Sequence, residues 1–158
     1  QLNGQWNLVQ QPLAAVIFYV CLLAEANRAP FDLAEAESEL IGGYHTEYSS
    51  MKFALFFLGE YFHIVTGSAF FVVLFMGGWS VNPFTGLDLP VEGGPLLMLA
   101  QIAVVLGKVT LMVSLTMAIR WTLPRFRYDQ LMNLGWKSLI PIALVNMLIT
   151  AAVILWLK

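Results

Sequence analysis

Residues 96–121 read LLMLAQIAVVLGKVTLMVSLTMAIRW and include only two charged side chains, Lys108 and Arg120. A helix needs about 20 mostly apolar residues to cross the hydrocarbon core of a bilayer. The run meets that length and lacks the alternation of apolar and polar residues that a barrel strand shows. Because only helices and closed barrels satisfy their backbone polar groups in lipid, the run is predicted to be a transmembrane helix.

The composition of the whole chain agrees with a membrane protein. Of its 158 residues, 59% are hydrophobic and 11% are charged, whereas average soluble domains carry about 25% charged residues. A soluble core of this size could not hide so much apolar surface from water. Lipid is therefore expected to be the solvent for much of the chain.

Three further apolar runs accompany the first. They are residues 11–26, which is the shortest, 53–79 and 138–157. The predicted fold class is all-α: a polytopic transmembrane helix bundle of about four spans, in a single membrane domain over residues 1–158. The first residue is Gln1, and we expect further residues upstream of it.

The chain offers no metal-ligand set. Its one cysteine, Cys21, lies in an apolar run, so no internal disulfide can form. No group of Cys and His has metal-ligand spacing, and no basic run interleaved with aromatic residues suggests nucleic acid. Cys21 is expected to be a small buried apolar residue.

The distribution of Lys and Arg predicts the orientation. Segments 27–52 (the acidic loop) and 120–137 (the basic loop) carry Lys and Arg, whereas 80–95 has none. The positive-inside rule places both named loops in the cytoplasm. The favoured location is the inner membrane of a bacterial cell, with an organelle inner membrane as the alternative.

Acidic residues are concentrated between Glu25 and Glu60, a stretch that holds seven of the ten acids in the chain. They are Glu25, Asp32, Glu35, Glu37, Glu39, Glu47 and Glu60. Such a density between two membrane spans is unusual, so the stretch is a candidate functional region.

Local signals predict a short amphipathic helix inside the acidic loop. Pro30 should end the preceding span because it disfavours helix just before it. Asp32 followed by Glu35 resembles a capping box at the start of a helix over residues 33–41, and the Gly42–Gly43 pair would end it.

The acids of that helix have two interpretations. Glu35 and Glu39 share one face while Glu37 points elsewhere, and like charges at this spacing favour binding a proton between them. The alternative is a solvated acidic surface helix. Apolar Leu33 and Leu40 argue against full solvation, since they need a surface to pack on.

Two ionisable residues are expected inside spans. Glu60 lies eight residues past Lys52, about 12 Å along a helix, with His63 on the same face. Lys108 lies about 18 Å from Arg120 by the same rise. Such costly residues favour ion or proton conduction. The alternative is a structural pair, for instance Glu60 with Lys108, while His63 is expected to be a packing or hydrogen-bonding residue.

Basic residues near the membrane surface also leave alternatives open. Arg28 could pair with Asp32 or orient a polar ligand headgroup by hydrogen bonds. Arg125 and Arg127 in the basic loop could serve as a topology anchor and a contact for anionic lipid, and Asp129 could cap a short helix.

Two segments carry a family resemblance. EANRAPFDLAEAESELIGGYHTEYSSMKFALFFLGEY (residues 25–61) and IRWTLPRFRYDQLMNLGWK (residues 119–137) resemble the signatures of the NADH-quinone oxidoreductase H-subunit family, known in mitochondria as NADH dehydrogenase subunit 1. The resemblance covers essentially the whole chain and corresponds to the family's last four spans. Ala26, Ala34 and Gly59 depart from the common residues without removing an ionisable group.

The resemblance implies a role in a respiratory complex I-type enzyme. Arg28, Phe31 and Asp32 match positions that line or border the quinone chamber. Five acids match positions on the acidic path from that chamber into the membrane: Glu25, Glu35, Glu37, Glu39 and Glu60. Lys108 matches a buried basic position on the same path. The chain itself would hold no cofactor. The implied partners are quinone, membrane lipid and the other complex I subunits, which would hold NADH, FMN and the iron–sulfur clusters.

Three other functions compete with this one. A homologous membrane component of a nickel–iron hydrogenase or formate hydrogenlyase complex would have a different electron partner. A free-standing ion transporter would need discontinuous helices or repeats, and the sequence shows neither. A non-catalytic membrane anchor would have no use for residues as costly as Glu60 and Lys108.

Overall fold

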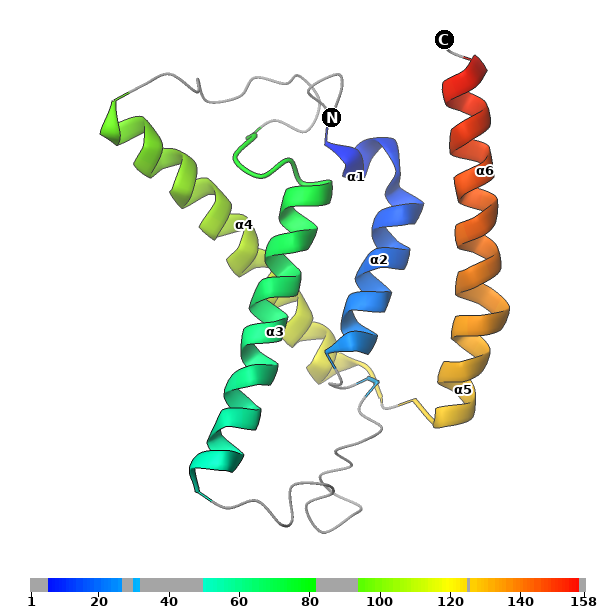
Figure 1. The fold of residues 1–158 in the computed structure, drawn as a ribbon, viewed down its shortest axis with the longest axis horizontal. Coiled ribbons are helices and arrows are strands. Elements are labelled where there is room, and N and C mark those ends of the chain that lie inside the picture. Colours follow the sequence, from blue (N-terminus) through cyan, green and yellow to red (C-terminus); the bar gives the residue numbers. More distant parts are fainter. Residues whose placement is uncertain (1–5, 27–29, 32–49, 82–93, 125, 157–158) are drawn as a thin grey trace.

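The computed structural model describes residues 6–26, 30–31, 50–81, 94–124 and 126–156, and within these ranges every regular element is helical. In chain order the elements are α1 (Asn7–Gln10), α2 (Pro12–Glu25), α3 (Met51–Phe75), α4 (Pro95–Thr122), α5 (Tyr128–Asn133), a π-helical segment (Leu134–Leu139) and α6 (Ile140–Trp156). Figure 1 shows long helices joined by connecting segments. The predicted all-α helical membrane bundle is confirmed.

In the part of the chain that the structure describes, three helices have the length and composition to cross a membrane: α3, α4, and the continuous helix formed by α5, the π-helical segment and α6. The apolar helix α2 has 14 residues, or about 21 Å at 1.5 Å per residue. That is short of the roughly 20 residues that a span needs. Residues 11–26, predicted as a full span, therefore contain a shorter helix that Gln11 separates from α1.

The predicted second span is too long at its C-terminal end. The run 53–79 is apolar throughout, yet α3 ends at Phe75. Gly77 and Gly78 follow with φ of 71° and 58°, a left-handed conformation that glycine adopts without steric cost. The Gly78 N–H donates to the Val72 carbonyl over 3.2 Å, a bond that is typical of a helix C-terminus closed by glycine.

The helix that contains the fourth predicted span begins ahead of that span. Residues 138–157 were expected, but the continuous helix starts at Tyr128, within the basic loop. The Arg127 N–H donates to Gln130 Oε1 over 3.1 Å, and this side-chain bond closes the first turn. Asp129 therefore lies in the first turn and does not precede the helix as a cap.

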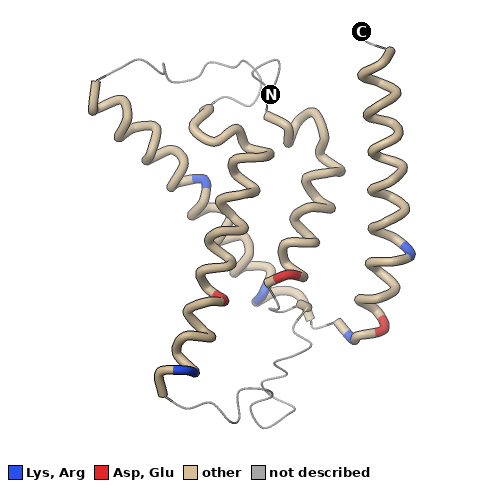
Figure 2. Tube along the Cα trace, in the orientation of Figure 1, with Lys and Arg blue, Asp and Glu red and all other residues tan. Residues whose placement is uncertain are grey.

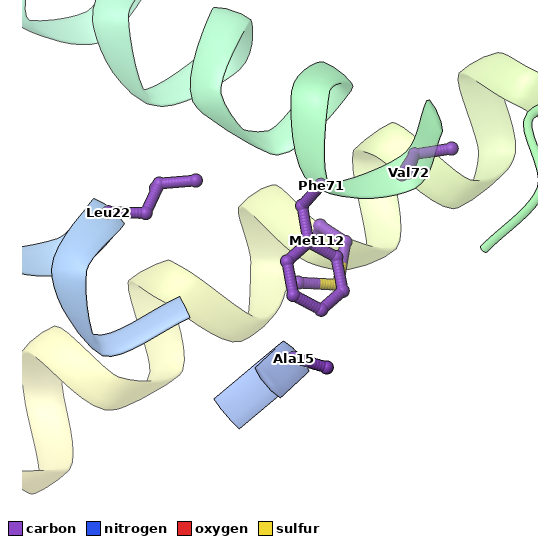
Figure 3. Packing of buried hydrophobic residues seen from close by; sticks show 5 residues of the cluster. All are labelled: Ala15, Leu22, Phe71, Val72 and Met112. Carbon is purple, nitrogen blue, oxygen red and sulfur yellow. The ribbon is translucent and has the colours of Figure 1, made fainter. Parts of the chain in front are cut away.

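The core lies between α2, α3 and α4. Figure 3 shows its buried side chains, which are Ala15 and Leu22 of α2, Phe71 and Val72 of α3, and Met112 of α4. A polar contact joins the same helices: the hydroxyls of Tyr19 and Thr116 lie 3.1 Å apart. Thr116 donates its own hydrogen to the Met112 carbonyl, so Tyr19 is the donor to Thr116.

Helix α6 stands beside α2 at one side of the core (Figure 1). None of its residues is buried, and its apolar side chains are exposed along its length. The long helix α4 also exposes large apolar residues over most of its length. An apolar surface of this extent is expected to face lipid or neighbouring protein.

Candidate functional site

The acidic and basic loops meet through two aromatic residues. The Phe126 N–H donates to the Pro30 carbonyl over 2.9 Å. The rings of Phe31 and Phe126 stack with centroids 5.5 Å apart and planes inclined by 20°. Phe31 is buried, with 5% of its surface exposed. We call Pro30, Phe31 and Phe126 the motif junction, since each comes from one of the two segments that carry the family resemblance.

The motif junction contains one of the three residues predicted for the quinone chamber. That residue is Phe31. Arg28 and Asp32 lie outside the described residues, as do the predicted amphipathic helix of the acidic loop and its acids Glu35, Glu37 and Glu39.

A cavity of about 460 Å³ lies directly beside the motif junction. Phe31 forms part of its wall, and α2 and the helix that begins with α5 supply the rest. The lining residues are Val20, Cys21, Ala24, Phe31, Leu131, Met132, Leu134, Gly135, Trp136, Leu139 and Ile140. A largely apolar wall and this volume are typical of a site for a small organic molecule.

The π-helical segment (Leu134–Leu139) shapes one side of this cavity. A π-helical turn inserts an extra residue into the helical repeat and changes the direction of the side chains that follow. Gly135 and Trp136 on this segment both line the cavity. The segment was not predicted from the sequence, because no single residue type marks a π-turn.

A second cavity, of about 210 Å³, is lined by residues of α2 and α3, which include an acid and an imidazole. Glu25 Oε1 lies 3.9 Å from His63 Nε2. The lining consists of Phe18, Cys21, Leu22, Glu25, His63, Thr66, Gly67 and Phe70. Cys21 borders both cavities and is exposed, so the expectation that it is a buried packing residue was wrong.

A close approach between α2 and α3 sets the spacing of this pair. A Cβ atom built at Gly67 would lie 3.0 Å from Leu22 Cγ. Leu22 precedes Glu25 by three residues, and Gly67 follows His63 by four. Both separations are about one helical turn. The Leu22–Gly67 contact is thus one turn away from the Glu25–His63 pair on each helix.

Glu60 lies on α3, three residues before His63, and is partly buried. Residues three apart on a helix are neighbours on one face. Figure 2 shows how few positions along the described helices are charged. Two of the acids predicted for the path therefore have a place near His63. Glu25 lies 3.9 Å from it across the two helices, and Glu60 lies on the same face of α3.

Lys108 reaches the C-terminal end of α3. Its ammonium group donates to the Met76 carbonyl over 2.8 Å, to the Gly78 carbonyl over 2.9 Å, and to the Ser80 carbonyl. Nζ also lies 4.2 Å from the centroid of the Trp6 ring, within the range of a cation–π interaction. The Trp6 indole donates to Ser80 Oγ over 3.1 Å.

The predicted alternative of a direct Glu60–Lys108 pair is wrong. Glu60 precedes Met76 by 16 residues on α3, or about 24 Å along the axis. Since Lys108 contacts the Met76 carbonyl, its side chain cannot also reach Glu60. Its contacts favour a structural role, in which Lys108 of α4 holds the backbone that follows α3.

Two contacts of this region are not predicted by the sequence, those of Phe126 and His63. Phe126 belongs to the basic-loop signature but was given no role, and its partner Phe31 lies 95 residues earlier. The sequence predicts His63 to be a packing or hydrogen-bonding residue on the same face as Glu60, but it does not identify Glu25 as a neighbour. Only the packing of α2 on α3 reveals that His63 also lies near Glu25.

Comparisons with known proteins identify the family. The family model described as NADH dehydrogenase matches residues 1–151. The chain is 49% identical over 157 residues to the NADH-quinone oxidoreductase H-subunit of Flavobacterium johnsoniae, covering 98% of the chain and 44% of that protein. It is also 49% identical over 155 residues to the NADH-quinone oxidoreductase H-subunit 1 of Cytophaga hutchinsonii, with the same coverage.

A third relative extends the same result. The chain is 45% identical over 164 aligned positions to the NADH-quinone oxidoreductase H-subunit of Flavobacterium psychrophilum, covering 100% of the chain and 46% of that protein. The chain therefore spans less than half the length of these curated relatives.

Proposed function

Because this chain belongs to the NADH dehydrogenase family, we propose that it acts within the membrane arm of a proton-translocating NADH:quinone oxidoreductase. It contributes to the quinone-binding chamber and couples quinone reduction to proton translocation. The observation that carries the proposal is the motif junction, where the two family-like segments meet beside a 460 Å³ apolar cavity.

The proposed quinone chamber is formed by Arg28, Phe31 and Asp32. The position of Phe31 supports this assignment, because its ring is held by Phe126 at the edge of the apolar cavity. A quinone has a flat ring and an apolar tail, which suit aromatic and aliphatic walls. Arg28 would donate hydrogen bonds to the polar headgroup.

The proposed proton path consists of Glu25, Glu35, Glu37, Glu39 and Glu60. Reduction of a quinone to a quinol takes up two electrons, which other subunits would supply, and two protons. Acids of the loop that supply these protons would be left with additional negative charge. Clustered carboxylates titrate as a coupled group and respond to such a change together. Lys108 is proposed to hold the end of α3 in place and is left off the path, because its ammonium donates to three backbone carbonyls.

The partners follow from this function. NADH, FMN and the iron–sulfur clusters are proposed to reside on other subunits of the complex. Among the described residues, no group of three or more His, Cys, Asp or Glu side chains could hold a metal ion. The protein is proposed to lie in a bacterial inner membrane, with the acidic and basic loops on the cytoplasmic side.

A double substitution tests the function. Glu35→Gln with Glu37→Gln in the intact complex removes two titratable groups and retains their size. We expect NADH-driven quinone reduction and proton pumping to fall, while NADH oxidation by an artificial electron acceptor is retained. The assay uses membrane vesicles, with a pH-sensitive dye for pumping.

Asp88→Asn with Glu92→Gln is the matched control, since it removes two acids from segment 80–95, predicted to lie on the opposite side. This variant should keep both activities. Normal quinone reduction and pumping in the Glu35→Gln/Glu37→Gln variant would contradict the role proposed for the acidic loop.

A further inference from the structure

We propose that His63 is a proton-transfer residue that connects Glu25 with Glu60. The inference rests on the proposed function and deepens it, because it adds an imidazole to a path otherwise made of carboxylates. It starts from the juxtaposition of an acid at the end of α2 and a histidine in the middle of α3, at the wall of a cavity between the two helices.

The distance between Glu25 and His63 suits a transient proton contact. Their nearest atoms are 3.9 Å apart, longer than the 2.7–3.2 Å or so of a direct N–H···O hydrogen bond. A small side-chain rotation or one water molecule closes such a gap. The carboxylate side chain is 73% exposed and the imidazole 41%, so protons can reach the pair from the Glu25 side.

Close packing of α2 on α3 maintains this distance. The absence of a side chain at Gly67 lets Leu22 approach within 3.0 Å of the position that a Cβ atom would take. Because the contact is one turn from both Glu25 and His63, the two helices cannot separate there without moving the acid away from the imidazole.

The cavity beside the pair provides a suitable environment. Phe18, Leu22 and Phe70 make much of its wall apolar, while Glu25, His63 and Thr66 supply the polar groups that could hold a water molecule. Its volume of about 210 Å³ far exceeds the roughly 10–15 Å³ of probe volume that one water molecule needs. Water can therefore bridge Glu25 and His63.

The two ring nitrogens allow His63 to pass a proton on. A protonated Glu25 gives its proton to Nε2 of the neutral ring, which becomes imidazolium, while Glu25 becomes a carboxylate. The proton on Nδ1 then leaves for the carboxylate of Glu60. The result is a neutral Glu60 and a neutral ring protonated on Nε2, and exchange of that proton between the nitrogens restores the starting state.

The placement of Glu60 completes the connection. Glu60 and His63 are three residues apart on α3, a spacing that puts their Cβ atoms about 5–6 Å apart on the same face. Two carboxylic acids on different helices, Glu25 on α2 and Glu60 on α3, are thereby joined by one imidazole.

The test is His63→Gln in the intact complex, assayed in sealed membrane vesicles. Glutamine retains the hydrogen-bonding character of the side chain but does not titrate. A positioned proton-transfer group contributes about 10²–10⁴-fold to a rate. We expect pumping and coupled quinone reduction to fall by about tenfold. This loss is smaller than the full contribution of such a group, because water carries part of the proton flux. NADH oxidation by an artificial acceptor should be unchanged.

Chemical rescue separates proton transfer from a structural role. In His63→Ala, imidazole added to the medium should restore a part of the lost pumping, whereas a structural defect would not respond to it. Thr66→Val is the matched control, because it alters a polar side chain on the same cavity wall and removes no titratable group. If His63→Gln does not assemble, His63→Asn takes its place.

The outcomes distinguish this inference from the proposed function. Wild-type complex without NADH-driven quinone reduction would overturn the proposed function itself. Active wild-type complex together with full pumping in His63→Gln would overturn the relay alone. Reduced pumping in His63→Ala that imidazole leaves unchanged would also overturn the relay and assign His63 to packing.

Discussion

The ring of Phe31 stacks on the ring of Phe126 at 5.5 Å although 95 residues separate them. The Phe126 N–H also donates to the carbonyl of Pro30, just before Phe31. One backbone bond and one aromatic pair thus join the acidic and basic loops. The proposed chamber depends on this junction, because Phe31 also lines the apolar cavity beside it.

The stack predicts energetic coupling between its two residues. Phe31→Ala and Phe126→Ala should each lower kcat/KM for quinone, and the double variant should lose less than the two single effects combined. The expected coupling energy is about 0.5–1.5 kcal/mol, as for other aromatic pairs. Steady-state quinone reduction by each variant measures it.

Trp121→Ala provides the comparison for this cycle, because Trp121 is 84% exposed near the same end of α4. Combined with Phe31→Ala, it should show additive effects. Additive effects of Phe31→Ala and Phe126→Ala would mean that the stack does not support the quinone site.

A substitution of Lys108 can distinguish a structural role from a role in proton conduction. Lys108→Arg retains a permanent positive charge with N–H donors but cannot release its proton. If Lys108 holds the end of α3, this variant should keep pumping. Loss of pumping in a fully assembled Lys108→Arg complex would restore Lys108 to the proton path.

Removal of the charge at Lys108 should destabilise the bundle. Lys108→Met deprives the carbonyls of Met76, Gly78 and Ser80 of this donor. At about 1 kcal/mol for each lost hydrogen bond, we expect a loss of about 3 kcal/mol. A lower midpoint of thermal inactivation would show it. Lys137→Met, which alters an exposed cation, should leave the midpoint unchanged.

Substitution of Gly67 by valine should destabilise the packing of α2 on α3, and a second substitution, Leu22→Ala, should reverse part of this effect. A valine at this position would collide with Leu22 and force α2 away from α3, at a cost of about 1–3 kcal/mol. Leu22→Ala should recover part of that loss, because it makes room for the new side chain. Thermal inactivation of the single and double variants measures both effects.

Gly107→Val is the control for Gly67→Val, since a Cβ atom at Gly107 has open space around it. It should have little effect on the midpoint. An equal loss in the Gly67→Val and Gly107→Val variants would show that helix propensity, and not the contact with Leu22, explains the result.

Helices were predictable because long apolar runs without the alternation of a barrel strand satisfy their backbone in lipid only as helices. Their ends were harder to predict. The run 53–79 is apolar to its end, yet Gly77 and Gly78 turn the chain after Phe75. The side chain of Gln130 starts the last helix within the basic loop. Both ends depend on local hydrogen bonding and backbone conformation, which mean hydropathy does not register.

Contacts within the candidate site were predictable only in part. The resemblance selected Phe31 and Glu25 because each belongs to a family signature. Their partners Phe126 and His63 lie on other elements, so only tertiary packing identifies them. Lys108 was recognised as a costly residue, but its three carbonyl acceptors follow from where α3 ends.

The most direct test of the central claim is mass spectrometry of the native complex, purified in mild detergent through a tag on the full-length protein. The proposed function predicts that an NADH-oxidising flavoprotein and iron–sulfur subunits co-purify with it. Co-purification of a nickel–iron hydrogenase large subunit with an intact nickel site, in place of the flavoprotein, would contradict the proposed function and remove the quinone role assigned to Arg28 and Asp32.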